Sequence, residues 1–277
     1  MEAPSALRFD ELDFGPGRAP GPAASVLRDV LEGRRLGVVV RGVLPLELAA
    51  QAVRSFAGRQ AEIAANPAEY YEGRVFGRLL TTETELERYF DEAGRFAQAF
   101  DAVAGGEVRA RIDAVLAHLG GGQPVEPARD ARGRAYLALS VREMLPGGSI
   151  LPHYENEALD CPQMAELAAR LTPRAQVSVY VPLQVPQAGG ILRLYALREE
   201  HAKSRAFMTG DRQSPAALAA LDAEVAYLDT PVGAGDLLVF DASRYVHRVT
   251  KVEGARSRWT MGCFVGREAG GALVRWT

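Results

Sequence analysis

The second half of the chain, from Ala135 onward, is a series of short β-like segments, and this feature most constrains the fold. The segments are apolar or alternate apolar and polar residues: Tyr136–Met144, Gln176–Leu183, Ile191–Tyr195, Asp236–Phe240, Tyr245–Lys251 and Arg258–Val265. Turns rich in glycine and proline separate them, for example Pro146-Gly147-Gly148. Many short strands joined by such turns indicate a β-sandwich or a β-barrel.

The first half shows helical periodicity instead. Apolar residues recur at three- and four-residue spacing in Ala23–Leu31, Pro45–Phe56, Glu83–Val103 and Arg109–Leu119. The run Leu36–Val40 is strand-like, and Gly120–Gly122 is a helix-stop signal. We therefore expect an α+β protein with a mainly β core. Residues 1–134 would form a helical support layer of the same globular unit, and residues 135–277 a jelly-roll core.

Composition excludes several functions. The chain has 32 basic and 35 acidic residues and no basic stripe with aromatics, which argues against a nucleic-acid binder. No apolar run is long enough to span a bilayer, and the N-terminus lacks the pattern of a secretory signal. Two cysteines, Cys161 and Cys263, are too few for a disulfide framework. We expect a cytoplasmic protein that acts on a small molecule; its oligomeric state stays open.

Two of the four histidines have informative neighbours. His118 falls in a predicted helix and His201 in a charged stretch, so a structural or surface role suits both. His153 precedes Glu155 by two residues, and residues two apart on a strand project from one face. An imidazole and a carboxylate so placed are two corners of the 2-His-1-carboxylate arrangement that holds non-haem iron. A strand histidine beside a surface glutamate is the commoner origin of such a pair.

The third corner is available in a predicted hairpin. A buried strand, Asp236–Phe240, is followed by a short turn and a return strand that carries His247. Arg256, Arg258 and Thr260 come next and alternate onto one face if their segment is a strand. An inward guanidinium beside a hydroxyl would bind a carboxylate.

These residues resemble the motifs of the iron(II)/2-oxoglutarate-dependent dioxygenase superfamily. The resemblance covers roughly residues 142–264 and lies in LPGGSILPHYE, VSVYVPLQVPQAGGILRLY and GDLLVFDASRYVHRVTKVEGARSRWTMGCF. It implies a double-stranded β-helix of the prolyl-hydroxylase-like or small-molecule hydroxylase type. The implied iron ligands are His153, Glu155 and His247. Arg258 would hold the distal carboxylate of 2-oxoglutarate with Thr260 in support, and Arg256 is an alternative to Arg258.

The implied activity is hydroxylation of an unactivated C–H bond, with O2 consumed and succinate and CO2 released. Related iron halogenases lack the carboxylate ligand and use its position for chloride, so Glu155 favours oxidation over halogenation. Glutamate replaces the commoner aspartate here, and its longer side chain must bend to reach the metal. The N-terminal half carries no family motif. A small polar substrate, such as an amino acid or a biosynthetic intermediate, is the expectation.

Three further residues are candidates for binding the substrate. Arg142 lies on a predicted strand and either binds a carboxylate or faces water. Asn156 follows the glutamate and is a substrate contact or a turn residue, and Tyr180 lines the cavity or packs in the core. The segment 198–227 is long for a connection and contains a predicted helix, Pro215–Val225, which suggests a lid.

Two rival interpretations predict different behaviour. A cupin-like metalloenzyme that does not use 2-oxoglutarate would tolerate replacement of Arg256 and Arg258. A non-catalytic jelly-roll binding module would tolerate replacement of His153 and His247. Neither explains why an arginine pair follows the distal histidine.

Overall fold

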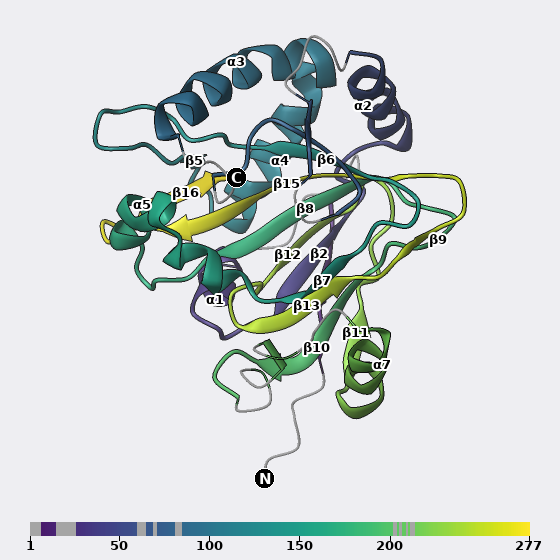
Figure 1. The fold of residues 1–277 in the computed structure, drawn as a ribbon. Coiled ribbons are helices and arrows are strands. Elements are labelled where there is room, and N and C mark those ends of the chain that lie inside the picture. Colours follow the sequence, from purple (N-terminus) through teal and green to yellow (C-terminus); the bar gives the residue numbers. More distant parts are fainter. Residues whose placement is uncertain are drawn as a thin grey trace.

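The structure, a computed structural model, describes residues 7–14, 26–59, 65–68, 71–80, 85–201, 204, 207–208, 210 and 214–277. Two sheets face each other, with helices against the outside of each (Figure 1). The ten-stranded major sheet has the order β1-β2-β12-β8-β15-β6-β4-β3, and β16 pairs with β15 and β5. The minor sheet has the order β11-β10-β13-β7, and β14 pairs with β9 apart from both.

The strands of the major sheet are β1 (Asp10–Asp13), β2 (Gly37–Arg41), β3 (Ala65–Pro67), β4 (Gly73–Phe76), β5 (Val125–Pro127), β6 (Ser140–Met144), β8 (Val177–Gln184), β12 (Leu237–Phe240), β15 (Arg258–Arg267) and β16 (Leu273–Trp276). Those of the minor sheet are β7 (Ile150–His153), β10 (Leu192–Arg198), β11 (Tyr227–Asp229) and β13 (Tyr245–Val249). The short pair is β9 (Ala188–Gly189) and β14 (Val252–Glu253).

Side chains of β15 point alternately to the hydrophobic core and to the space between the two sheets. Trp259, Met261 and Cys263 are buried in the main hydrophobic cluster, on the helical side of the major sheet. Arg258 and Thr260 therefore point the other way, toward the minor sheet. The space between the two sheets is where the polar side chains of this strand gather.

The helical layer confirms most of the expected helices. It comprises α1 (Val26–Leu31), α2 (Leu46–Gly58), α3 (Leu86–Ala104) and α4 (Gly106–Leu119). Phe56 of α2 lies 5.4 Å from Phe76 and 6.0 Å from Phe100, ring centre to ring centre, which ties α2 to β4 and α3. The expected start of the first helix, residues 23–25, lies outside the described residues, as do residues 83–84 of the third.

The α+β, mainly β fold is confirmed, with three differences of detail. Residues 1–134 supply β1 to β5 as well as helices, so this region extends the major sheet. Regular strand starts at Ser140 rather than Tyr136. The strand expected to carry both His153 and Glu155 is β7, which ends at His153. None of the described helices is long and apolar enough to cross a membrane.

The segment predicted to be a lid contains α7 (Pro215–Glu224), as expected. Leu221 of α7 packs with Tyr195, Leu197 and Val246. Since Leu194 and His247 alternate with these residues and face inward, α7 covers the outer face of the minor sheet. Residues 202–203, 205–206, 209 and 211–213 of the predicted lid lie outside the described part of the chain.

Two further helical segments follow the first histidine of the site. They are the 3-10 helices η2 (Glu155–Asp160) and η3 (Pro162–Met164), and η3 leads into α5 (Ala165–Arg170). Together they connect the minor sheet back to β8 of the major sheet.

Candidate metal centre and its pocket

Three side chains converge at one end of the space between the sheets. Ligand-type atoms of His153, Glu155 and His247 all lie within 4.8 Å of one another. Glu155 Oε1 is 3.4 Å from Nε2 of His153 and 3.8 Å from Nε2 of His247. No other such group of histidine, cysteine or acidic residues occurs in the part of the chain that the structure describes.

The backbone fixes this convergence. His153 and His247 are cross-strand partners on β7 and β13, which brings their rings to 4.3 Å, centre to centre. Strand β7 ends at His153, and Glu155 begins η2 rather than continuing the strand as expected. Tyr154 is still extended, so the two-residue spacing keeps both side chains on one side. The backbone N–H of Glu155 donates to the carbonyl of Ala242 over 2.8 Å and anchors the turn.

The histidines present the right nitrogen to a metal. Nδ1 of His153 lies 2.7 Å from the carbonyl oxygen of Leu151, and Nδ1 of His247 lies 2.9 Å from that of Tyr245. A carbonyl can only accept, so each Nδ1 carries the proton and each Nε2 turns its lone pair toward Glu155. Two imidazoles and one carboxylate on one side of a cavity are the donor set of non-haem iron(II) sites.

The charge states suit metal binding as well. Burial alone would raise the pKa of Glu155, but the nearby imidazoles of His153 and His247 outweigh it and hold that pKa well below its ordinary value. Burial and the nearby His153 lower the pKa of His247. The glutamate is therefore a carboxylate and His247 a neutral imidazole near neutral pH, the forms that ligate metals.

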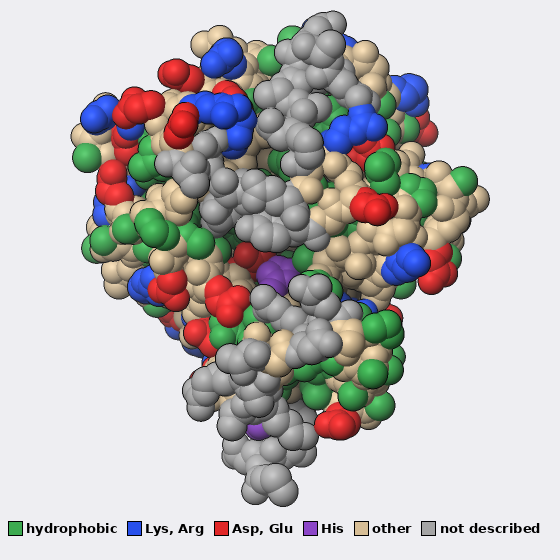
Figure 2. All heavy atoms as spheres, in the orientation of Figure 1, with side chains coloured by type: hydrophobic (Ala, Val, Ile, Leu, Met, Phe, Trp, Pro, Cys, Tyr) green, Lys and Arg blue, Asp and Glu red, His purple; other side chains and the backbone are tan. Residues whose placement is uncertain are grey.

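A pocket that is partly open to solvent adjoins the cluster. Its lining joins both sheets: Tyr71, Arg142, Met144, Ile150, His153, Glu155, Ser178, Tyr180, Leu192, Phe240, His247, Val249, Arg258 and Thr260. Figure 2 shows a histidine side chain visible in a hollow of this face. The side chain of His153 is 27% exposed and that of His247 only 4%, so the cluster is open on the His153 side.

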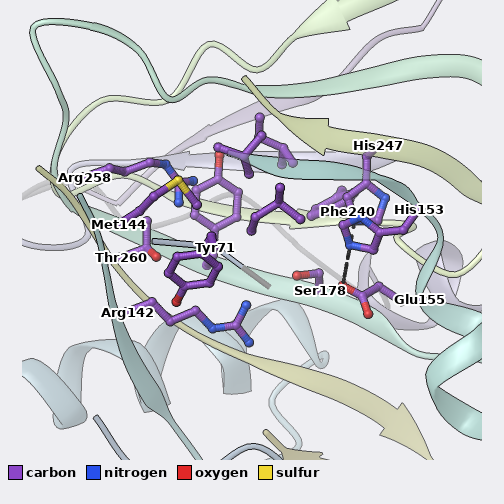
Figure 3. Close-up of a pocket in the computed structure, with 14 residues that line it drawn as sticks. Tyr71, Arg142, Met144, His153, Glu155, Ser178, Phe240, His247, Arg258 and Thr260 are labelled. Atoms are coloured by element: carbon purple, nitrogen blue, oxygen red, sulfur yellow. Dashed lines mark ion pairs between the residues drawn. The ribbon is translucent and has the colours of Figure 1, made fainter. Parts of the chain in front are cut away.

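Arg258 and Thr260 lie in this pocket, at the end away from the metal ligands (Figure 3). The Arg258 guanidinium carbon is 5.6 Å from the ring centre of Tyr180. Gly190, at φ +61°, leaves it room: a Cβ there would lie 3.2 Å from Arg258 Cδ. Arg256 is exposed in the loop before β15 and does not line the pocket, so the expected shared face is absent.

The three expected substrate residues separate. Arg142 and Tyr180 line the pocket. Asn156 does not; its side-chain amide donates to Glu199 over 2.7 Å, and its amide oxygen is buried without a partner in the described part of the chain. His118 and His201 lie outside the cluster, His118 in α4 with its ring 6.3 Å from that of Phe14.

Tyr71, Ser178 and Phe240 also line the pocket but are not among the site residues predicted from the sequence. Ser178 could have been found, because it alternates with buried Val177 and Val179 on β8. Tyr71 precedes β4 in a stretch without periodicity, so no local signal marks it.

Comparisons with known proteins agree with this geometry. A family model described as carrier-protein-independent halogenase WelO5 matches residues 21–269. No curated protein matches the chain in sequence. An N-substituted L-amino acid dioxygenase from Burkholderia ambifaria AMMD has a similar fold, with a TM-score of 0.57 and 14% identity over 98% of this chain and 96% of that one. The structure of that dioxygenase with α-ketoglutarate gives 0.55, at the same identity and coverage.

The family match spans most of the chain and includes all three members of the cluster. The expected class, an enzyme that uses iron(II) and 2-oxoglutarate, is thereby confirmed, while the choice between hydroxylation and halogenation is not. The chain belongs to the family of the carrier-protein-independent halogenase WelO5, within the iron(II)/2-oxoglutarate-dependent oxygenases.

Proposed function

We propose that this enzyme hydroxylates an unactivated C–H bond of a small polar molecule, such as an amino acid or a biosynthetic intermediate. The observation that carries the proposal is the convergence of His153, Glu155 and His247 beside a pocket lined by arginines. Iron(II) and 2-oxoglutarate, when bound, would supply the oxidising chemistry, in which 2-oxoglutarate, O2 and the substrate yield succinate, CO2 and the alcohol. The protein's contribution is to hold these groups in position and to limit water.

The two ends of the pocket bind different groups. His153, Glu155 and His247 hold the metal. Arg258, supported by Thr260, holds the distal carboxylate of 2-oxoglutarate. Burial lowers the pKa of the Arg258 guanidinium, and among the described residues no carboxylate pairs with it, so an incoming carboxylate would provide the missing partner.

An apolar wall limits water at the metal ligands. The ring of Phe240 meets that of His247 edge-on at 5.0 Å. Leu192 and Val249 extend this wall along the pocket. Removal of water from the site would strengthen every electrostatic contact inside it.

Glu155 favours hydroxylation over halogenation, although the family model is that of a halogenase. In a halogenase of this class chloride takes the place of the carboxylate. Here the carboxylate lies between two histidine nitrogens and is ionised, so it would occupy that place and repel a halide.

The first test needs no substrate. Anaerobic addition of iron(II) and 2-oxoglutarate should give a weak charge-transfer band in the visible spectrum, and His247→Ala should abolish it. If iron binds without a band, the enzyme does not use 2-oxoglutarate and a cupin-like activity replaces the proposal. If iron does not bind, the metal site itself is wrong.

A second test separates hydroxylation from halogenation. Chloride should leave the wild-type band unchanged and shift it in Glu155→Gly, where the carboxylate no longer blocks the position. A chloride response in wild type as large as in the variant would favour halogenation.

We also propose that the enzyme works in the cytoplasm. Within one globular unit, residues 1–134 would be the support region and residues 135–277 the catalytic core. Cys161 and Cys263 are both free thiols, as a reducing compartment would keep them.

A further inference from the structure

A second arginine, Arg142, faces the same pocket and has no acidic partner in the described ranges of the chain. It lies on β6 directly opposite Thr260 of β15. Figure 3 shows its guanidinium directed toward the end of the pocket that holds Ser178 and Glu155. Within the described residues, neither an ion pair nor a hydrogen bond engages it, and its side chain is half-buried. A half-buried guanidinium without a partner loses hydration and gains nothing in return.

Two arginines away from the pocket are paired with acidic residues. Arg275 of β16 lies 2.6 Å from Asp113, and Arg244 lies 2.5 Å from Asp241. The lack of an acidic partner at Arg142 and Arg258 is therefore a property of the pocket.

Tyr71 adds a second unsatisfied group at the same place. Its hydroxyl is buried and has no hydrogen-bond partner among the described residues. Its ring lies beside Arg142 in Figure 3, and the charge of Arg142 is close enough to act on the hydroxyl. A guanidinium and a phenol together offer three or more donors to one anion.

The charges of the site leave room for one more anion. The two pocket arginines and iron(II) carry one more positive charge than Glu155 and dianionic 2-oxoglutarate can balance. Within the cavity Arg142 and Arg258 also repel each other, and this repulsion lowers the pKa of Arg258 beyond the effect of burial. A single carboxylate would balance the site, whereas a phosphate dianion would exceed it.

We propose that Arg142 and Tyr71 bind the carboxylate of the substrate, so that the enzyme oxidises a small carboxylic acid. This inference rests on the proposed function, because it assumes that Arg258 is occupied by 2-oxoglutarate. The alternative use of Arg142 is as a second clamp for 2-oxoglutarate, and the two uses predict different variants to fail.

The test uses the full chain loaded with manganese(II), which holds the ligands without turnover. 2-Oxoglutarate is added to saturation and thermal unfolding is followed. Acetate, propionate and isovalerate are then titrated against acetamide, propionamide and isovaleramide, which have the same shape without the charge. The variants are Arg142→Leu, Tyr71→Phe, Arg258→Leu and, as a control, Arg54→Leu, which removes an exposed guanidinium of α2.

We expect at least one of the acids, and none of the amides, to stabilise the wild type and the Arg54→Leu control further. Arg142→Leu should weaken that response about tenfold or more, and Tyr71→Phe by a few-fold, about threefold to tenfold. The 2-oxoglutarate response should survive in Arg142→Leu and be lost in Arg258→Leu.

Three results would overturn the inference: no acid stabilises wild type beyond its amide, Arg142→Leu keeps the acid response, or Arg142→Leu loses 2-oxoglutarate as Arg258→Leu does. In each of these the wild-type response to 2-oxoglutarate still stands. If 2-oxoglutarate itself fails to stabilise the wild type, the proposed function fails with it.

Discussion

The two sides of the minor sheet use charged residues in opposite ways. On the outer side, Arg193 is bound bidentately by Asp229, at 2.7 and 2.9 Å, and also lies 2.9 Å from Asp222. Arg248 donates to Asp222 and to the hydroxyl of Tyr195, each over 2.6 Å. On the inner side, Arg142 and Arg258 of the facing major sheet line a pocket and have no acidic partner among the described residues.

The pKa shifts of the arginines express the same contrast. The hydrogen bond to Asp229 raises the pKa of Arg193, whereas burial lowers the pKa of Arg258. An arginine that is paired with a carboxylate stabilises the protein without any ligand. An unpaired arginine in the pocket is stabilised only when a ligand binds to it. The outer network therefore holds α7 and β11 on the sheet, and the inner arginines are kept for binding.

The sharpest test of this division uses two adjacent residues of β13, His247 and Arg248, which point to opposite sides. His247→Ala should weaken iron(II) or manganese(II) binding by about 100-fold or more, because one of three ligands is lost. Its stability without metal should change little. Metal affinity is measured by calorimetric titration and stability by urea unfolding.

Arg248→Leu is the matched control and should behave in reverse. Metal affinity should stay near the wild-type value while the protein unfolds at lower urea. Equal losses of metal affinity in both variants would mean that the two sides are not independent.

The next test compares the two candidate clamps for 2-oxoglutarate. Arg258→Leu should reduce the affinity of the metal-loaded protein for 2-oxoglutarate by about 30-fold or more, since a charge-assisted pair is worth about 2–3 kcal/mol. Arg256→Leu should change it by less than about twofold, because Arg256 is exposed outside the pocket. Titration of the charge-transfer band gives both values. Tolerance of both replacements would instead support the cupin-like interpretation.

The outer network can be broken at its centre. Asp222 contacts Arg193, Arg248 and Tyr195, so Asp222→Ala leaves three donors without their acceptor. We expect a loss of about 2–3 kcal/mol in the free energy of unfolding, less than for a fully buried network because 27% of the Asp222 side chain is exposed. Urea unfolding measures the loss. Binding of 2-oxoglutarate at a temperature where the variant is folded should be unchanged, and a lost affinity would show that α7 matters to the site.

The same contrast shows which features could be predicted from the sequence and which could not. Alternation along strands is local, so the pattern around His153, His247 and Arg258 could place these side chains on inward faces. Arg256 shows the limit of this argument, because the strand begins only at Arg258 and alternation does not extend into the loop before it. Likewise, the composition predicts the helix Pro215–Val225. The side of the minor sheet that this helix covers could not be predicted, because it depends on the ion pairs of Asp222 with Arg193 and Arg248.

Pairing is a tertiary property, and for this reason the sequence could not show it. Arg142 and Arg193 are both arginines on strands, and nothing in their neighbours tells which one meets a carboxylate. Tyr71 enters the pocket from a segment without periodicity, so its role depends wholly on where the chain passes. Pairing is best inferred from a structure, and here it separates the arginines that maintain the fold from those available to a ligand.

The smallest expected effect concerns the stability of the protein when Arg258, which has no acidic partner, is replaced. If Arg258 is kept for a ligand at a cost to the empty protein, Arg258→Met should raise the free energy of unfolding without 2-oxoglutarate by about 0.5–1 kcal/mol. The gain would come from relief of its burial and of the repulsion from Arg142. With metal and saturating 2-oxoglutarate the order should reverse, because only the wild type gains from binding. Urea unfolding under both conditions measures the crossing. A variant less stable in both would show that Arg258 supports the fold as the outer arginines do.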